Sequence, residues 1–192
     1  MITLYHGTDS LSAENIINKG IDVSIGENSV DNGKGFYMTP NPKFAMRRAE
    51  YAVEMMKRKK ALSLEPTVLE IKLHIHENEL SVKKFDGCSY EWKEFVLLNR
   101  LGIDFLQRNN ITSTNHNLDL KYDIVIDETA DHDINTLVFE VNNDKSHSLT
   151  YMHDRINKIK PKEKSSDPDW DKQVSIHTKK GCSCVFSIEI LK

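Results

Sequence analysis

A histidine and a glycine near the start of the chain form the first group that could bind a ligand. Residues 4–8 read LYHGT, so a short apolar run leads into an imidazole, a glycine and a hydroxyl. An imidazole can donate or accept a hydrogen bond, and a glycine lets a ligand approach the main chain closely. A histidine that only anchors its own turn is the competing interpretation.

A second segment combines glycines with aromatic side chains. Residues 31–39 read DNGKGFYMT, so Gly33 and Gly35 precede Phe36 and Tyr37. The segment lacks the Gly-x-x-x-x-Gly-Lys-Ser/Thr spacing of a phosphate-binding loop. Its glycines and aromatic pair instead suit a flat backbone surface with an aromatic wall, on which a planar ring can stack. A glycine-rich turn into a core strand is the alternative.

Taken together, the two segments resemble the ADP-ribosyltransferase superfamily, in which a His and a Tyr begin a His–Tyr–Glu signature and hold NAD. Ala45 and Ala49 match the alanine-rich helix that follows the Tyr strand there. The chain is also similar to a family of uncharacterised bacterial proteins assigned to that superfamily. The similarity runs through residues 4–8, 33–39, 91–100, 122–126, 130–131 and 173–178.

The resemblance implies NAD contacts for the residues of the two motifs: His6, Gly7, Thr8, Gly35, Phe36 and Tyr37. His6 is expected to hydrogen-bond the ribose hydroxyls on the adenosine side, and the Gly7 backbone to hold the nicotinamide amide. Thr8 would support that turn. Tyr37 is expected to stack on the nicotinamide ring, with Phe36 behind it in the core.

The third position of the superfamily signature is often a Glu at the start of a late strand. There it bonds the nicotinamide-ribose 2′-hydroxyl and stabilises the oxocarbenium-like centre as the glycosidic bond breaks. The matching strand here starts at Gln173. An amide can bond that hydroxyl but carries no charge. The missing Coulomb attraction is worth several kcal/mol, enough to slow the reaction by orders of magnitude.

Two residues of the 91–100 segment are further candidates. Glu94, with Glu91 as its alternative, is the competing acid for the third position, and the other interpretation is a solvated helix face or a pair that interacts with the helix dipole. Arg100 is expected to line the cleft near the pyrophosphate, or else to form a structural ion pair with Asp123 or Asp127. The candidate catalytic residues are therefore His6, Tyr37, Gln173 and Glu94.

No metal site is expected. His74 and His76 lie on one strand face, which is half of a metal site, but no third ligand follows at a diagnostic spacing. The three cysteines, Cys88, Cys182 and Cys184, contain no Cys-x-x-Cys pair. This argues against a disulfide scaffold and favours a reducing cytoplasm.

The elements that position these residues mix strands and helices without a regular βαβ alternation. Strands are expected at residues 2–5, 36–39, 67–76, 122–126, 135–141, 173–176 and 185–190. Helices are expected after a Ser12 cap, from Pro42, between Ser89 and Gly102, and over 149–159. On the helix from Pro42, Arg47 and Arg48 are expected to face outward, opposite an apolar stripe formed by Ala45, Ala49, Ala52 and Met56. The charged stretch 158–171 is expected to be an exposed loop.

This mixture predicts an α+β fold with one domain over residues 1–192. The resemblance makes its core a split, mostly antiparallel pair of small sheets with peripheral helices. The NAD cleft would then lie between the sheets.

The composition is that of a globular chain. Its 26 Lys and Arg against 29 Asp and Glu give a formal net charge of −3, which disfavours a globally basic nucleic-acid binder. No apolar run approaches the roughly 18 residues of a membrane span, and the first residues lack the pattern of a signal peptide. We therefore expect no membrane partner and a cytoplasmic location, or delivery as an effector.

The function implied by the resemblance is NAD-dependent mono-ADP-ribosyl transfer, with NAD as the substrate. The acceptor would be a protein, a nucleic acid or a small molecule. Such bacterial enzymes often act as toxins, so a cognate antitoxin is a candidate partner. The alternatives are a non-catalytic module that binds NAD or ADP-ribose, which Gln173 favours, and an NAD glycohydrolase.

Overall fold

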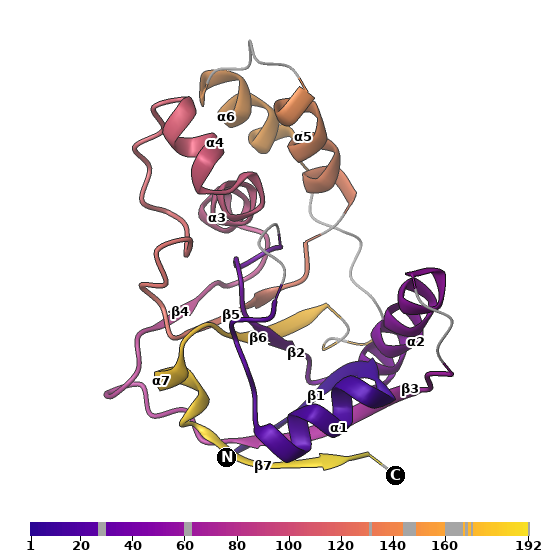
Figure 1. Cartoon of the computed structure of the whole chain (residues 1–192). Helices are drawn as coiled ribbons and strands as arrows, with labels where there is room; N and C mark the ends of the chain where they lie inside the picture. The colour runs from indigo at the N-terminus through magenta and orange to yellow at the C-terminus, as the bar shows by residue number, and fades with distance from the viewer. Residues whose placement is uncertain are drawn as a thin grey trace.

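The computed structural model describes residues 1–26, 30–59, 63–130, 132–143, 149–159, 167, 169 and 171–191. The strands are β1 (Ile2–Asp9), β2 (Phe36–Met38), β3 (Pro66–Leu73), β4 (Val82–Lys84), β5 (Ile124–Glu128), β6 (Lys172–Ile176) and β7 (Val185–Ile190). The helices are α1 (Ser10–Lys19), α2 (Pro42–Lys59), α3 (Tyr90–Leu101), α4 (Ile103–Arg108), α5 (His132–Asn143), α6 (Leu149–Lys158) and α7 (Lys179–Cys182). Figure 1 shows their arrangement.

The strands form two sheets, one in the order β1-β3-β7 and one in the order β2-β6-β5-β4. Neighbouring strands are antiparallel except for the parallel pair β4 and β5. The sheets meet where Tyr5 of β1 pairs with Thr39, directly after β2, through hydrogen bonds of 2.7 and 2.9 Å. The predicted α+β fold with two small, mostly antiparallel sheets is confirmed.

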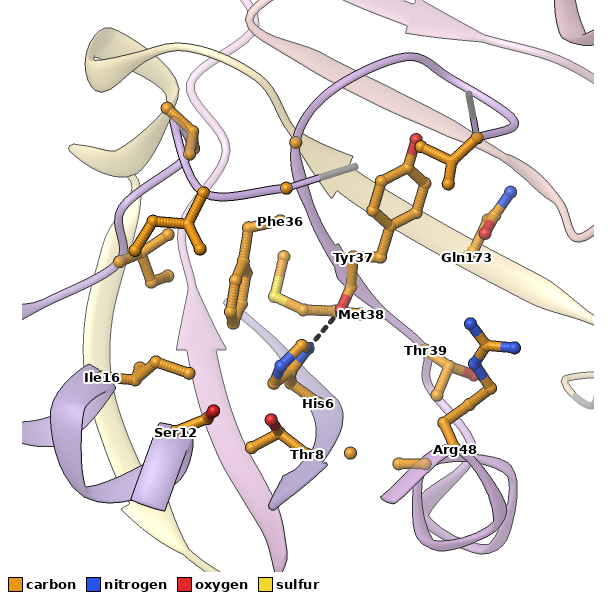
Figure 2. Close-up of a pocket in the computed structure, with 18 of the residues that line it drawn as sticks. His6, Thr8, Ser12, Ile16, Phe36, Tyr37, Met38, Thr39, Arg48 and Gln173 are labelled. Carbon is orange, nitrogen blue, oxygen red and sulfur yellow. Dashed lines mark hydrogen bonds between the residues drawn. The ribbon is translucent and has the colours of Figure 1, made fainter. Parts of the chain in front are cut away.

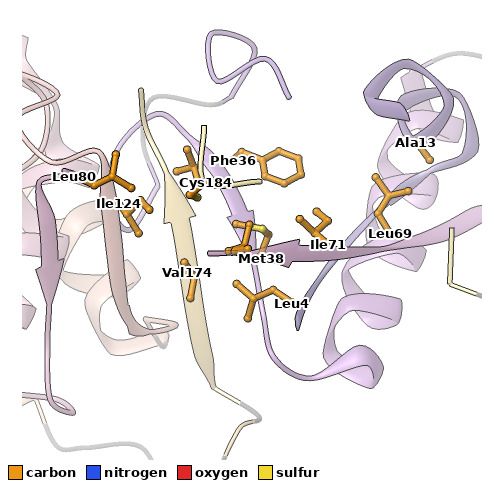
Figure 3. Packing of buried hydrophobic residues seen from close by; sticks show 12 residues of the cluster. Leu4, Ala13, Phe36, Met38, Leu69, Ile71, Leu80, Ile124, Val174 and Cys184 are labelled. Carbon is orange, nitrogen blue, oxygen red and sulfur yellow. The ribbon is translucent and has the colours of Figure 1, made fainter. Parts of the chain in front are cut away.

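The core between the sheets is built from the buried faces of both. Alternate residues of a strand point to the same face, so a strand with an apolar residue at every second position has one apolar face, which is buried in the core. Figure 3 shows how the side chains interlock. The contributors from the strands include Leu4, Leu69, Ile71 and Leu73 of one sheet and Phe36, Met38, Ile124, Val174 and Ile176 of the other.

Helix α1 begins earlier than the sequence indicated. Its N-cap is Asp9, whose carboxylate accepts a hydrogen bond from the Ser12 amide at 2.9 Å. The expectation that Ser12 caps the helix is therefore wrong. The expected strand over 2–5 continues to Asp9 because the whole segment pairs with β3.

Helix α2 packs on β1 through its small residues. Ala45 and Ala49 are buried. A Cβ atom on Gly7 would lie only 1.7 Å from the Ala45 carbonyl oxygen. The absence of a side chain at Gly7 therefore allows the helix to approach the strand.

Helices α3 to α6 form a second group beside the four-stranded sheet (Figure 1). Ser89 caps α3, since its hydroxyl accepts a hydrogen bond from the Trp92 amide at 3.1 Å, and Gly102 ends it at a φ of 80°. Both helix ends agree with the prediction. The apolar side chains of this group include Leu97, Leu98, Phe105, Leu106, Leu137, Val141, Met152 and Ile156.

The strand expected over 135–141 is wrong, because these residues belong to α5. Ile134, Leu137 and Val141 are buried at spacings of three and four residues, which is the period of a helix. Packing against α3 and α6 outweighs the strand propensity of the β-branched residues. The short strand β4 was not expected.

The expected loop over 158–171 lies largely outside the described residues. The single domain over 1–192 stays a prediction. Within the described part of the chain, no helix combines the length and the apolar character needed to cross a membrane.

Candidate functional site

A cavity of about 1290 Å³ opens between the two sheets and helices α1 and α2. Most of the site residues expected from the sequence line it: His6, Gly7, Thr8, Gly35, Phe36, Tyr37, Arg100 and Gln173. Figure 2 shows His6, Tyr37 and Gln173 around this space, with Arg48 on the side of α2. Residues from β1, β2 and β6, which are far apart in the sequence, thus share one cavity.

His6 is held in one tautomer by the main chain. Its Nδ1 atom lies 2.7 Å from the Tyr37 carbonyl oxygen. Because a carbonyl only accepts, Nδ1 carries the proton and Nε2 is left as an acceptor. Nε2 has no hydrogen-bond partner within the described residues. Burial lowers the pKa of His6 below its ordinary value, so the ring is neutral at pH 7.

The half-buried Gly7 lies on β1, at the edge of the three-stranded sheet that does not face β3. Tyr5, two residues earlier, directs its N–H and C=O toward Thr39, away from β3. Val68, opposite Gly7, gives its carbonyl to the Leu191 amide on the β7 side. Since hydrogen-bonding direction alternates along a strand, the Gly7 N–H and C=O also point away from β3. Within the described residues they have no partner, and Gly7 lines the cavity.

Tyr37 is fixed by its hydroxyl. The hydroxyl donates to the Gly33 carbonyl at 2.6 Å and accepts from the Asn32 amide at 3.0 Å. Burial raises the pKa of Tyr37 well above its ordinary value, so the phenol stays protonated. The ring lies beside Gln173 in Figure 2 and lines the cavity.

Phe36 does not lie behind Tyr37 as expected. Successive residues of β2 point to opposite faces, and the Phe36 ring stacks on His6 with 4.2 Å between the ring centroids. It packs in the core between the sheets and also lines the cavity. Phe36 therefore supports His6, the first residue of the expected signature, rather than the second.

Gly35 is a glycine because of the protein's own packing. A Cβ atom there would lie 2.6 Å from Nδ1 of His177. That ring donates from Nδ1 to the Lys34 carbonyl at 2.8 Å, and its Nε2 accepts from the Ser175 hydroxyl at 2.9 Å. Burial lowers the pKa of His177 to about 4, consistent with a neutral imidazole.

Gln173 occupies the third position at the start of β6, and its buried side chain lines the cavity. Its neighbour is Asp31, a carboxylate that also lines the cavity. The amide nitrogen of Gln173 donates to Asp31 Oδ2 at 3.1 Å. Asp31 was not singled out from the sequence, because no local signal marks a contact across this distance.

Arg100 lies at the cavity but is engaged in the structural ion pair that was the alternative reading. Its partner is Asp31, not Asp123 or Asp127. Asp127 instead accepts hydrogen bonds from Asn32 and Trp92, and burial raises its pKa to about 8. The charge of Arg100 is therefore largely balanced before any ligand binds.

Glu94 is not among the residues that line the cavity. Its carboxylate accepts a hydrogen bond from Asn115 and contacts His153 of α6 at 3.2 Å. Helix α3 turns its apolar residues to the core and leaves Glu94 facing another helix. Glu94 therefore lies away from the cavity, and Gln173 alone occupies the third position.

Three cations at the cavity were missed or misplaced. Arg48, expected to face outward, lines the cavity, and so do Lys19 of α1 and Lys179 of α7. Arg48 has no acidic partner within the described residues. Arg48 follows Ala45 by three residues and therefore lies at the border of the buried stripe that contains Ala45 and Ala49. This spacing could have indicated its position from the sequence.

No group of three or more His, Cys, Asp or Glu residues suited to a metal ion occurs among the residues described.

Residues 2–186 match the model of a family described as a protein of unknown function (DUF3990). The chain belongs to this family. The matched range contains every cavity residue named above. Comparisons with curated proteins and with solved structures gave no match.

Proposed function

We propose that the chain has an ADP-ribosyltransferase-like fold and is an NAD-dependent mono-ADP-ribosyltransferase whose NAD site is this cavity. The observation that carries the proposal is the convergence of His6, Tyr37 and Gln173 from three strands of the two sheets. A volume of about 1290 Å³ exceeds the roughly 300–1,000 Å³ of common ligand pockets, so it has room for a dinucleotide.

The polar groups of the cavity match the parts of NAD in turn. Nε2 of His6 can accept a hydrogen bond from a ribose hydroxyl. The N–H and C=O of Gly7 are a donor and an acceptor on one residue, which is the complement of the nicotinamide carboxamide. Tyr37 offers a ring for stacking, and the exposed Arg48 offers a positive charge for the pyrophosphate.

The reaction would break the bond between the ribose C1′ and the nicotinamide nitrogen, and the bonding electrons would leave with nicotinamide. Positive charge then develops on the ribose. The Gln173 oxygen would accept a hydrogen bond from the 2′-hydroxyl and place the negative end of its dipole beside that charge. A nucleophile of the acceptor would bond to C1′ and lose its proton. We propose a macromolecule, protein or nucleic acid, as the acceptor.

A second candidate is a module that binds NAD or ADP-ribose without cleaving it. The observation that favours it is the amide at position 173, combined with the pairing of Asp31 to Arg100. With an uncharged third residue and a balanced carboxylate, the cavity provides binding groups but little stabilisation of a developing cation.

The test is nicotinamide release from NAD by the purified protein, with NAD binding followed by calorimetry on the same sample. Variants His6→Ala, Tyr37→Ala and Gln173→Ala are compared with Glu94→Gln, a matched change outside the cavity. Release that is lost in the first variants and kept in Glu94→Gln supports the enzyme. Free ADP-ribose as the only other product indicates a glycohydrolase, and binding without release indicates the module. A folded protein that neither binds nor cleaves NAD contradicts the proposal.

A further inference from the structure

We infer that Asp31 is a positioning residue for Gln173: it holds the amide so that oxygen, not nitrogen, is presented to the ligand. The identity of the ligand group that this oxygen binds rests on the proposed function. The arrangement itself is a property of the ligand-free protein and can be measured there.

Asp31 accepts hydrogen bonds on both carboxylate oxygens. Oδ1 receives the Arg100 guanidinium, with Nε at 2.8 Å. Oδ2 receives the Ala130 amide at 2.9 Å and the Gln173 amide nitrogen at 3.1 Å. The side chains of Asp31 and Arg100 are 8% and 11% exposed, so little water competes for these bonds. The Asp31 carboxylate therefore acts only as an acceptor, and any side chain that contacts it must present a donor.

The amide nitrogen of Gln173 has a second acceptor as well. It donates to the Glu128 carbonyl oxygen at 3.3 Å. Both neighbours of this nitrogen, a carboxylate and a carbonyl, can only accept. A flipped amide would put its oxygen against two other oxygens, so one orientation is strongly preferred.

This preference leaves Oε1 as the atom offered to a ligand. Oε1 has no hydrogen-bond partner within the described residues, while the side chain lines the cavity. In Figure 2 the amide oxygen lies on the Arg48 side and the nitrogen is turned away from it. An acceptor at this point would bind a hydroxyl of the ligand. Without Asp31 the amide could rotate and present donors instead.

The first experiment compares the side-chain amides of the glutamines, which are few enough to be observed separately. The chain contains only two glutamines, Gln107 and Gln173. Gln107 is exposed on α4 and serves as an internal reference. With ¹⁵N-labelled glutamine, the rate at which each side-chain amide exchanges its protons with water is measured by NMR. We expect the Gln173 protons to exchange at least about 10-fold more slowly than those of Gln107.

Asp31→Asn should remove this protection, because an amide at position 31 cannot accept from donors on both of its sides. Asp123→Asn is the matched control. Asp123 is a buried carboxylate that accepts from the Ser81 amide and lies outside the cavity lining. Its substitution should cost stability but leave the Gln173 protons protected.

Calorimetry with NAD then connects the orientation to binding. Asp31→Asn should weaken NAD about 3- to 10-fold, the worth of one hydrogen bond, and should have no further effect in the Gln173→Ala background.

The outcomes separate the two proposals. Equal exchange of both glutamines in the wild type overturns the inference without any variant, even if Asp31→Asn fails to fold. Protection that survives in a folded Asp31→Asn variant, or effects of the two substitutions that simply add, overturns it too. Protection of Gln173 in a protein that does not bind NAD upholds the positioning role and contradicts the proposed function.

Discussion

The ring of His6 and the main chain of Tyr37 are joined by a hydrogen bond of 2.7 Å, from Nδ1 to the carbonyl oxygen. The two residues expected to hold NAD are thus coupled without any ligand. The bond fixes the tautomer of His6, and Phe36 stacked on the ring fixes its plane. The acceptor atom Nε2 is therefore oriented in advance, which lowers the entropy lost on binding.

The first prediction concerns pH. Because burial lowers the pKa of His6 below 6.5, the ring should stay neutral down to that pH. NAD affinity should be constant from about pH 8 to 6.5 and fall at lower pH, since imidazolium has no acceptor. Calorimetry across this range checks it. A wild type whose NAD affinity increases as the ring becomes protonated would contradict the assigned tautomer.

Arg48 should contribute to affinity through its charge. Arg48→Gln is expected to weaken NAD binding about 2- to 5-fold, the usual worth of an exposed ionic contact, and less at high salt. The neighbouring Arg47 is also exposed but does not line the cavity. Arg47→Gln is therefore the control and should leave affinity unchanged. Equal losses in both variants would show a general effect of charge rather than a contact.

Gly7→Ala should destabilise the fold. The added Cβ would lie 1.7 Å from the Ala45 carbonyl oxygen, a main-chain atom that no rotamer change can move. We expect a loss of at least about 3 kcal/mol in the free energy of unfolding. Gly102→Ala is the comparison, since its Cβ would meet nothing within 4 Å and only its φ of 80° is unfavourable. That variant should lose about 1–3 kcal/mol, because a φ of 80° with a ψ of 163° is a region that essentially only glycine adopts. Urea unfolding measures both, and a smaller loss for Gly7→Ala would contradict the packing of α2.

Restoring the glutamate of the superfamily should fail as a single change. Gln173→Glu would place a second carboxylate near Asp31, whose Oδ2 now lies 3.1 Å from the Gln173 nitrogen. Repulsion between the two should lower stability and NAD affinity. The exchange Asp31→Asn with Gln173→Glu keeps the number of charges and should recover much of both. Unfolding and calorimetry on the single and double variants test this. A single variant as stable as the wild type would indicate that the two side chains do not face each other.

Stability should fall in weak acid because of His177. Its pKa in the folded protein, about 4, lies below the value of 6.5 expected on unfolding. The unfolded state therefore binds more protons between these values, and the stability present above pH 6.5 is lost as the pH falls toward 4. From pH 7.5 to 5 the loss is about 2 kcal/mol.

His177→Asn provides the control for this pH dependence. Its amide can replace the donor to the Lys34 carbonyl but cannot be protonated in this range. Urea unfolding of the variant should show a shallower dependence on pH than the wild type. The same dependence in both proteins would assign the effect to other groups.

The sequence alone determined the features that depend on residues close to one another in the chain, such as helix ends and apolar faces. The ends of α3 follow from Ser89 and Gly102 because a cap needs only a hydroxyl or a glycine within one helical turn. The strand over 67–76 was predicted and forms most of β3, and Ala45 and Ala49 of the predicted apolar stripe are buried on α2. His6, Tyr37 and Gln173 were named from segments that resemble the ADP-ribosyltransferase superfamily, and all of them line the cavity.

Only the tertiary structure decided which distant side chains meet. Asp31 and Gln173 are separated by 142 positions, and Asp31 and Arg100 by 69. Their contacts depend on β6 lying between β2 and β5 and on α3 packing beside that sheet. The same packing makes residues 135–141 helical, excludes Glu94 from the cavity and pairs Arg100 before a ligand arrives. Propensities and spacings act over a few residues, whereas these choices are set by the burial of whole elements against one another.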